Sequence, residues 1–154
     1  MVKTNAMRIL DAAKISYFAR EYDPEITDGE KVAAILNLDP DRVFKTLVTI
    51  GSDNEHYVFI VPVNYTLDLK KAALAVGVKR VEMIKQKELL PLTGYIHGGC
   101  SPIGMKKKFR TVLNDTATLF DKINVSGGRV GLQIEIKVED LISATEAAVI
   151  DLLA

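Results

Sequence analysis

At the centre of this chain lies the loop Gly98-Gly99-Cys100-Ser101-Pro102-Ile103-Gly104, whose three glycines and one proline exclude a packed helix or a central strand. Glycine permits positive φ and close backbone approach, so such a loop exposes peptide N–H and C=O groups to a partner. A tight turn between two strands is the simpler interpretation. Lysines and an arginine follow the loop directly and create a cationic surface beside it. This surface favours a ligand-binding loop over a simple turn. These basic residues are Lys106, Lys107, Lys108 and Arg110.

The charged residues are distributed unevenly along the chain. The 154 residues are 48% hydrophobic and have a formal net charge of zero, which fits one domain, expected over 1–154, with a substantial core. Residues 1–68 carry 7 Lys/Arg and 11 Asp/Glu, residues 69–110 carry 10 and 2, and residues 111–154 carry 3 and 7. The basic middle third contains the glycine loop and predicts a polyanionic partner, with a solvated lysine-rich face as the alternative.

Several classes of protein are disfavoured by the composition. No apolar run approaches the roughly 20 residues of a membrane span, and Met1–Asn5 lacks the apolar stretch of a signal peptide. The single cysteine excludes an internal disulfide and suits a reducing cytoplasm. Two histidines and one cysteine are too few for a zinc site, so no metal or other cofactor is expected. No P-loop or dinucleotide-binding glycine pattern occurs.

The hydrophobic periodicity predicts a mixed α+β domain with about seven strands and five or six helices. Residues 43–50 are rich in β-branched side chains and predict a strand. A further strand at Tyr95–His97 is expected to lead into the glycine loop. Thr27-Asp28-Gly29-Glu30 fits a capping box in which the Thr27 hydroxyl caps a helix. Residues 145–153 are expected to form a C-terminal helix.

Lys45 is the first candidate for chemistry, because it lies within a strand whose other residues are mostly apolar. Its ammonium can bind a phosphate or carboxylate or polarise a carbonyl. Alternatively, Lys45 lies on the solvent-exposed face of the strand and has no ligand role. A thiol nucleophile at Cys100 would need a base such as His97. Residues three apart on a strand-to-loop path point in different directions, so a small buried or half-buried cysteine is expected. Ser126-Gly127-Gly128-Arg129 is either a second pocket wall or a hairpin turn.

Three ordered motifs together resemble one family. They are Phe44-Lys45-Thr46-Leu47, then Gly94-Tyr95 with Gly98-Gly99-x-Ser-Pro-x-Gly and Lys106-Lys107, and finally Val125-Ser126-Gly127-Gly128. Over nearly its whole length the chain is similar to the YbaK/EbsC-type aminoacyl-tRNA deacylases, relatives of the prolyl-tRNA synthetase editing domain. The resemblance implies a YbaK-like fold, expected to be a barrel-like mixed β-sheet of about seven strands with surrounding helices.

The resemblance implies a cytoplasmic trans-editing enzyme that clears cysteine mischarged onto tRNA(Pro). The family is thought to let the substrate's own thiolate attack its carbonyl, so that the enzyme mainly holds a near-attack geometry. The implied partners are Cys-tRNA(Pro) and prolyl-tRNA synthetase, with no DNA, membrane or cofactor. Two alternatives stay open: a water-using deacylase for alanine or another small residue, and a non-catalytic module that binds tRNA or a synthetase.

The resemblance also assigns roles to individual residues. Lys45 matches the family's essential lysine, and Gly98 matches a glycine whose backbone holds the reacting ester. The implied substrate-binding residues are Tyr22, Thr46, Gly99, Ser101, Ser126, Gly127 and Gln133, and the implied tRNA-binding residues are Lys106 and Lys107. Two positions depart from some members of the family and bear on amino-acid specificity. Asp28 replaces an aromatic residue, and Gln133 replaces an aspartate.

Overall fold

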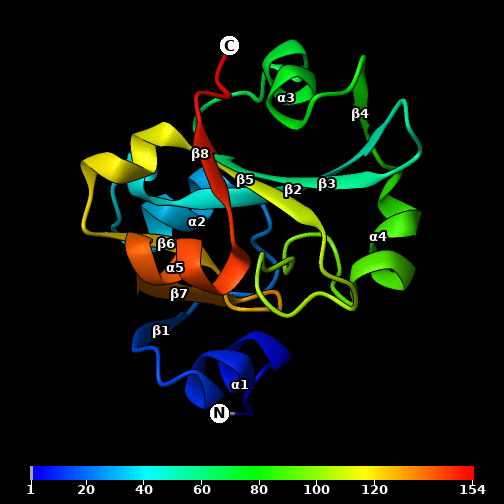
Figure 1. Ribbon diagram of the computed structural model, residues 1–154. Coiled ribbons are helices and arrows are strands. Elements are labelled where there is room, and N and C mark those ends of the chain that lie inside the picture. The colour runs from blue at the N-terminus through cyan, green and yellow to red at the C-terminus, as the bar shows by residue number, and fades with distance from the viewer. Residues whose placement is uncertain (1) are drawn as a thin grey trace.

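The computed structural model describes residues 2–154, which form two β-sheets with five α-helices around them (Figure 1). The helices are α1 (Asn5–Ala12), α2 (Gly29–Ile35), α3 (Leu69–Val76), α4 (Gln86–Thr93) and α5 (Val138–Thr145). The strands are β1 (Tyr17–Glu21), β2 (Phe44–Gly51), β3 (His56–Pro62), β4 (Val81–Met83), β5 (Arg110–Asn114), β6 (Lys122–Ser126), β7 (Leu132–Lys137) and β8 (Ala148–Ile150). Short 3-10 turns occur at Pro40–Arg42 and Asp115–Leu119. No helix within residues 2–154 has the length and apolar composition needed to cross a membrane.

The two sheets differ in size and in strand direction. The smaller sheet is antiparallel with the order β1-β7-β6, and the larger has the order β4-β2-β3-β5-β8. In the larger sheet β2 is antiparallel to both β3 and β4, whereas β5 runs parallel to β3 and to β8. An isolated bridge between Val43 and Asn124 joins the residue before β2 to β6, which places the start of β2 beside the smaller sheet.

The predicted α+β class is confirmed, but the barrel-like sheet of about seven strands is wrong. Residues 2–154 contain eight strands in two sheets and form no closed barrel. Residues 145–153 do not form the expected helix, because Ala148–Ile150 pairs in parallel with β5. Tyr95–His97 is not a strand. The Tyr95 N–H donates to the Thr93 hydroxyl at 3.1 Å and does not take part in a sheet.

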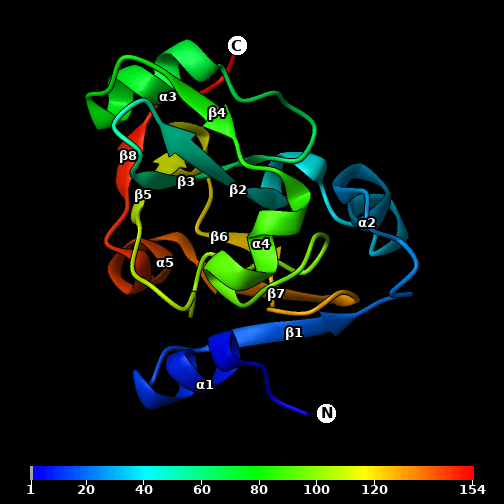
Figure 2. The same cartoon turned by 90° about the vertical axis from the view of Figure 1, so that its right-hand side faces the viewer.

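Two main groups of buried side chains hold these elements together. The N-terminal helix α1 packs Ala6, Met7 and Leu10 into the larger group, which also contains the apolar face of the three-stranded sheet. The second group lies between α3 and the five-stranded sheet. Figures 1 and 2 show α1 and β1 at one end of the molecule and α3 with the C-terminus at the other. Thr4 caps α1 by accepting from the Met7 N–H.

Candidate active site

A pocket of about 340 Å³ opens where the start of β2, the beginning of α2 and the glycine loop meet the β6–β7 hairpin. Most of the predicted site residues line it, although they come from five separate segments of the chain. They are Tyr22, Lys45, Thr46, Gly98, Ser126 and Gln133. Valine, leucine and phenylalanine side chains complete the wall, so the pocket is partly apolar.

The polar part of the pocket contains two oxygen atoms without a hydrogen-bond partner. Gln133 lies directly opposite Ser126 in the pairing of β6 and β7, so both side chains share one face of the sheet. Gln133 Oε1 and Thr46 Oγ1 are buried and have no hydrogen-bond partner within residues 2–154. Such orphan groups are rare in folded proteins and cost about 1–3 kcal/mol each when they stay unpaired. They are suited to a ligand that brings hydrogen-bond donors.

Lys45 is the single lysine or arginine in the pocket lining, and Asp28 is the single acid. The Lys45 side chain is half-buried and makes no ion pair within residues 2–154. An ammonium group in this position attracts a phosphate or a carbonyl oxygen. The predicted ligand role of Lys45 is therefore physically available, because no protein carboxylate occupies the ammonium.

Gly98 brings its backbone to the pocket in a conformation that favours glycine. Its φ is +84°, and a methyl group at this position would lie 3.0 Å from Thr27 Cγ2. Its N–H donates to no acceptor within residues 2–154, whereas the Gly99 N–H donates to the Ile96 carbonyl at 2.9 Å. Gly98 thus brings a peptide N–H without an acceptor to the lining of the pocket.

Three of the predicted substrate-binding residues lie outside the pocket lining. A methyl group at Gly99 would lie 2.6 Å from the Val130 nitrogen, so Gly99 lets the two glycine-rich loops touch. Ser101 is fully buried, and its Oγ accepts from the Ile103 N–H at 3.2 Å. Gly127 belongs to the turn between β6 and β7. The substrate contacts expected of these three residues therefore stay a prediction.

Cys100 and His97 also line the pocket, but they are not hydrogen-bonded to each other within the described chain. Burial raises the pKa of the Cys100 thiol to about 12, so this group is a neutral thiol near pH 7. The expectation of a small buried cysteine is confirmed. Residues 2–154 contain no group of three or more His, Cys, Asp or Glu side chains placed to hold a metal ion.

Thr27 and Asp28 are pocket residues that the sequence reasoning interpreted as a helix cap. Asp28 caps α2, because its Oδ2 accepts from the Lys31 N–H at 3.2 Å. The predicted capping box, with Thr27 as the cap, is therefore wrong, and the cap lies one residue later. Both residue types are favoured N-caps, and the Thr-x-x-Glu spacing of a capping box selected Thr27 although aspartate is the better cap. The shift leaves the Thr27 side chain free to pack against Gly98.

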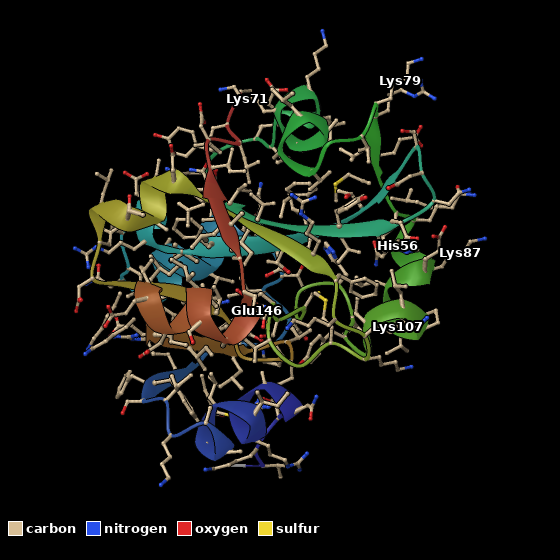
Figure 3. All side chains as sticks on the ribbon, viewed as in Figure 1. His56, Lys71, Lys79, Lys87, Lys107 and Glu146 are labelled. Carbon is tan, nitrogen blue, oxygen red and sulfur yellow. The ribbon has the colours of Figure 1, made fainter. Side chains whose placement is uncertain are left out.

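Lys106 and Lys107 do not line the pocket. In the basic middle third, some lysines are paired with carboxylates. Lys108 forms an ion pair with Glu146 at 2.6 Å, and Lys71 forms one with Asp151 at 2.8 Å. Figure 3 shows other side chains that project from the side of the molecule carrying β4 and α4, namely those of Lys79, Lys87 and Lys107. A cationic surface therefore remains on this side, with fewer free charges than the sequence suggests.

The chain belongs to the family of aminoacyl-tRNA editing domains, whose model matches residues 23–144. A relative from Enterococcus faecalis, provisionally named Cys-tRNA(Pro)/Cys-tRNA(Cys) deacylase EbsC, is 46% identical over 145 residues, which are 93% of this chain and 88% of the relative. A proline–tRNA ligase from Pelobacter propionicus is 31% identical over 84 residues, 54% of this chain and 15% of the ligase. The predicted family is confirmed.

A solved structure supports the same fold at lower identity. It is described as a provisional trans-editing enzyme for prolyl-tRNA synthetase and has a TM-score of 0.85. The comparison covers 100% of this chain and 99% of that chain at 22% sequence identity, which establishes a shared architecture.

Proposed function

We propose that this protein is a single-domain trans-editing deacylase that removes cysteine mischarged onto tRNA(Pro). The observation that carries the proposal is the pocket, in which a free lysine, a free peptide N–H and two unpaired oxygens converge in a member of the editing family. The relative named as a Cys-tRNA(Pro)/Cys-tRNA(Cys) deacylase supports cysteine as the amino acid.

Each polar group of the pocket suits one part of the aminoacyl ester. The Gly98 N–H would donate to the carbonyl oxygen, where negative charge develops during the reaction. Lys45 would hold the terminal adenosine or its phosphate by charge. Gln133 Oε1 and Thr46 Oγ1 are unpaired acceptors and would receive the donors of the substrate's α-ammonium group.

The substrate supplies the nucleophile in this scheme. Its thiolate sulfur bonds to its own carbonyl carbon, and the bond from that carbon to the ribose oxygen breaks. The ribose oxygen takes a proton from solvent, which leaves free tRNA and a cyclic thiolactone. Cys100 is a poor alternative nucleophile, because burial keeps its thiol protonated. Holding the reacting atoms in a near-attack geometry is worth roughly 7–11 kcal/mol by itself.

Recognition of the tRNA body would be mainly electrostatic. The lysines of the α4 side would neutralise phosphates of the acceptor stem. They include Lys107 (Figure 3) and Lys106, whose N–H donates to the carbonyl of Thr93 at the end of α4. Such contacts carry no sequence information. Prolyl-tRNA synthetase would therefore be the partner that provides tRNA identity.

Deacylation of Cys-tRNA(Pro), Ala-tRNA(Pro) and Ser-tRNA(Pro) by the wild type and Lys45→Ala tests the proposal. Serine is the sharpest comparison, because it replaces the substrate sulfur by a weaker oxygen nucleophile. We expect cleavage of the cysteinyl ester alone and its loss in Lys45→Ala. Equal cleavage of alanyl or seryl esters would mean that water is the nucleophile, and binding without cleavage would indicate a non-catalytic module.

A further inference from the structure

Two consecutive residues at the start of α1 bond to the two loops that form the pocket walls. The Thr4 hydroxyl donates to the Gly127 carbonyl at 2.5 Å, and the Asn5 amide donates to the Gly104 carbonyl at 2.7 Å. Gly104 ends the glycine loop that begins at Gly98, and Gly127 follows Ser126. Each bond therefore joins the start of α1 to a segment that also contributes a lining residue, Gly98 or Ser126, to the pocket.

The packing at this junction is close. A methyl group at Gly104 would lie 2.9 Å from Asn5 Nδ2, and one at Gly128 would lie 3.1 Å from Thr4 Cβ. Both glycines have positive φ, +82° and +104°, so the backbone itself rests against the start of α1. The helix is anchored in turn, because its residues Ala6, Met7 and Leu10 are almost fully buried in the main core.

The two loops also contact each other and form one unit. The backbone at Gly99 lies so near Val130 that a methyl group there would come within 2.6 Å of the Val130 nitrogen. The Tyr95 hydroxyl donates to the Ile103 carbonyl at 2.6 Å and closes the glycine loop internally. A shift of this unit relative to α1 would therefore move pocket residues of both walls.

We propose that Thr4 and Asn5 are positioning residues, which fix the Gly98 N–H and Ser126 at the separation that the aminoacyl ester requires. Neither residue lines the pocket, and both lie outside residues 23–144, which the family model matches. The inference rests on the proposed function, because the positioning serves deacylation. Clamping both loops from one helix end limits their relative motion, and a misplacement of 1 Å in an active site can cost roughly 100-fold in rate.

The test must separate this role from helix capping, because Thr4 Oγ1 also accepts from the Met7 N–H at 3.2 Å. Thr4→Asp keeps a good capping acceptor but has no proton for the Gly127 carbonyl, whereas Thr4→Ser keeps both. We expect Thr4→Asp to lower kcat for Cys-tRNA(Pro) roughly tenfold, a fraction of the loss for a full 1 Å shift. KM should stay unchanged, because the basic surface is intact. Thr4→Ser should match the wild type.

Asn5→Ala provides an independent variant, and Arg8→Ala on the exposed face of the same helix is the matched control. Amide hydrogen exchange supplies a readout without substrate, at the Gly99 and Gly127 N–H groups, which are bonded in the wild type. We expect faster exchange in Thr4→Asp and Asn5→Ala, and wild-type exchange in Arg8→Ala.

The two readouts distinguish the inference from the function on which it rests. Unchanged exchange and unchanged kcat in Thr4→Asp and Asn5→Ala would overturn the positioning role. A wild-type protein that cleaves no ester would overturn the proposed function alone, while faster exchange in the variants would still support the mechanical link between α1 and the loops.

Discussion

Replacing Lys45 by methionine removes the positive charge of the pocket lining's one lysine, and the lining contains no arginine. The methionine keeps a long, unbranched side chain. The ammonium of Lys45 has no carboxylate partner within residues 2–154, so its loss leaves no protein charge unpaired. The free energy of unfolding should therefore change little. A substrate oxygen, by contrast, would lose its charge-assisted hydrogen bond.

The magnitude follows from the strength of one such contact. A hydrogen bond to a charged group contributes about 1.5–3 kcal/mol. Since about 1.36 kcal/mol corresponds to tenfold in rate, kcat/KM should fall roughly 10- to 150-fold in Lys45→Met. Lys45→Arg keeps the charge on a wider head group, so we expect an intermediate loss.

Single-turnover deacylation of Cys-tRNA(Pro), followed beside thermal unfolding, measures both quantities. Lys70→Met is the matched control, because Lys70 is an exposed lysine of α3 and lies outside the pocket lining. A fully active Lys45→Met protein would refute the assigned role. So would a rate loss that follows a matching fall in thermal stability, because it would show that Lys45 acts through the fold.

Three further predictions address the surface, the unpaired oxygens and the buried thiol. Replacing Lys106 and Lys107 by alanine should lower the slope of log K against log salt for tRNA binding by roughly 0.7–0.9 per lysine. Filter binding checks this, and Lys108→Ala should change the slope less, since Lys108 is paired with Glu146. Gln133→Leu should lower kcat/KM roughly tenfold without lowering the melting temperature, because the buried Oε1 has no protein partner to lose. The free energy of unfolding should fall as pH rises from about 9 towards 12, because the folded chain holds the Cys100 proton with a pKa of about 12 against 9.0 when exposed. Denaturant titrations should show a flatter decline for Cys100→Ala, with deacylation retained.

Local sequence signals identified the strand β2 but missed the strand Ala148–Ile150, which depends on a distant partner. The β-branched run in residues 43–50 marks β2 by itself, because side-chain type reports local fit to a sheet. The C-terminal strand Ala148–Ile150 is short and flanked by a helical pattern, and only its parallel pairing with β5 selects the extended conformation. The two-sheet arrangement depends on such long-range pairings, and the hydrophobic periodicity of a single segment does not indicate which distant strand it pairs with.

The candidate site shows the same division. The glycine loop and the mid-strand Lys45 stand out from residue type alone, since both break a local pattern. Nothing in their spacing brings Gln133 and Thr46 together, and only the family resemblance predicted both as pocket residues. The charge segregation was also misleading in part, because Lys108 of the basic third meets Glu146 of the acidic third in space.

The pocket also limits how the enzyme can discriminate among amino acids. Alanine is smaller than cysteine, so any cavity that admits a cysteinyl group also admits an alanyl group. Losing one small group in an apolar pocket changes specificity by only about 10–200-fold. Under the proposed function, rejection of alanine and serine would therefore come from chemistry. The buried Cys100 is a neutral thiol, so the site would favour an ester that brings its own nucleophile. Correctly charged prolyl-tRNA has no thiol, so the proposed mechanism would leave it intact without a separate exclusion device.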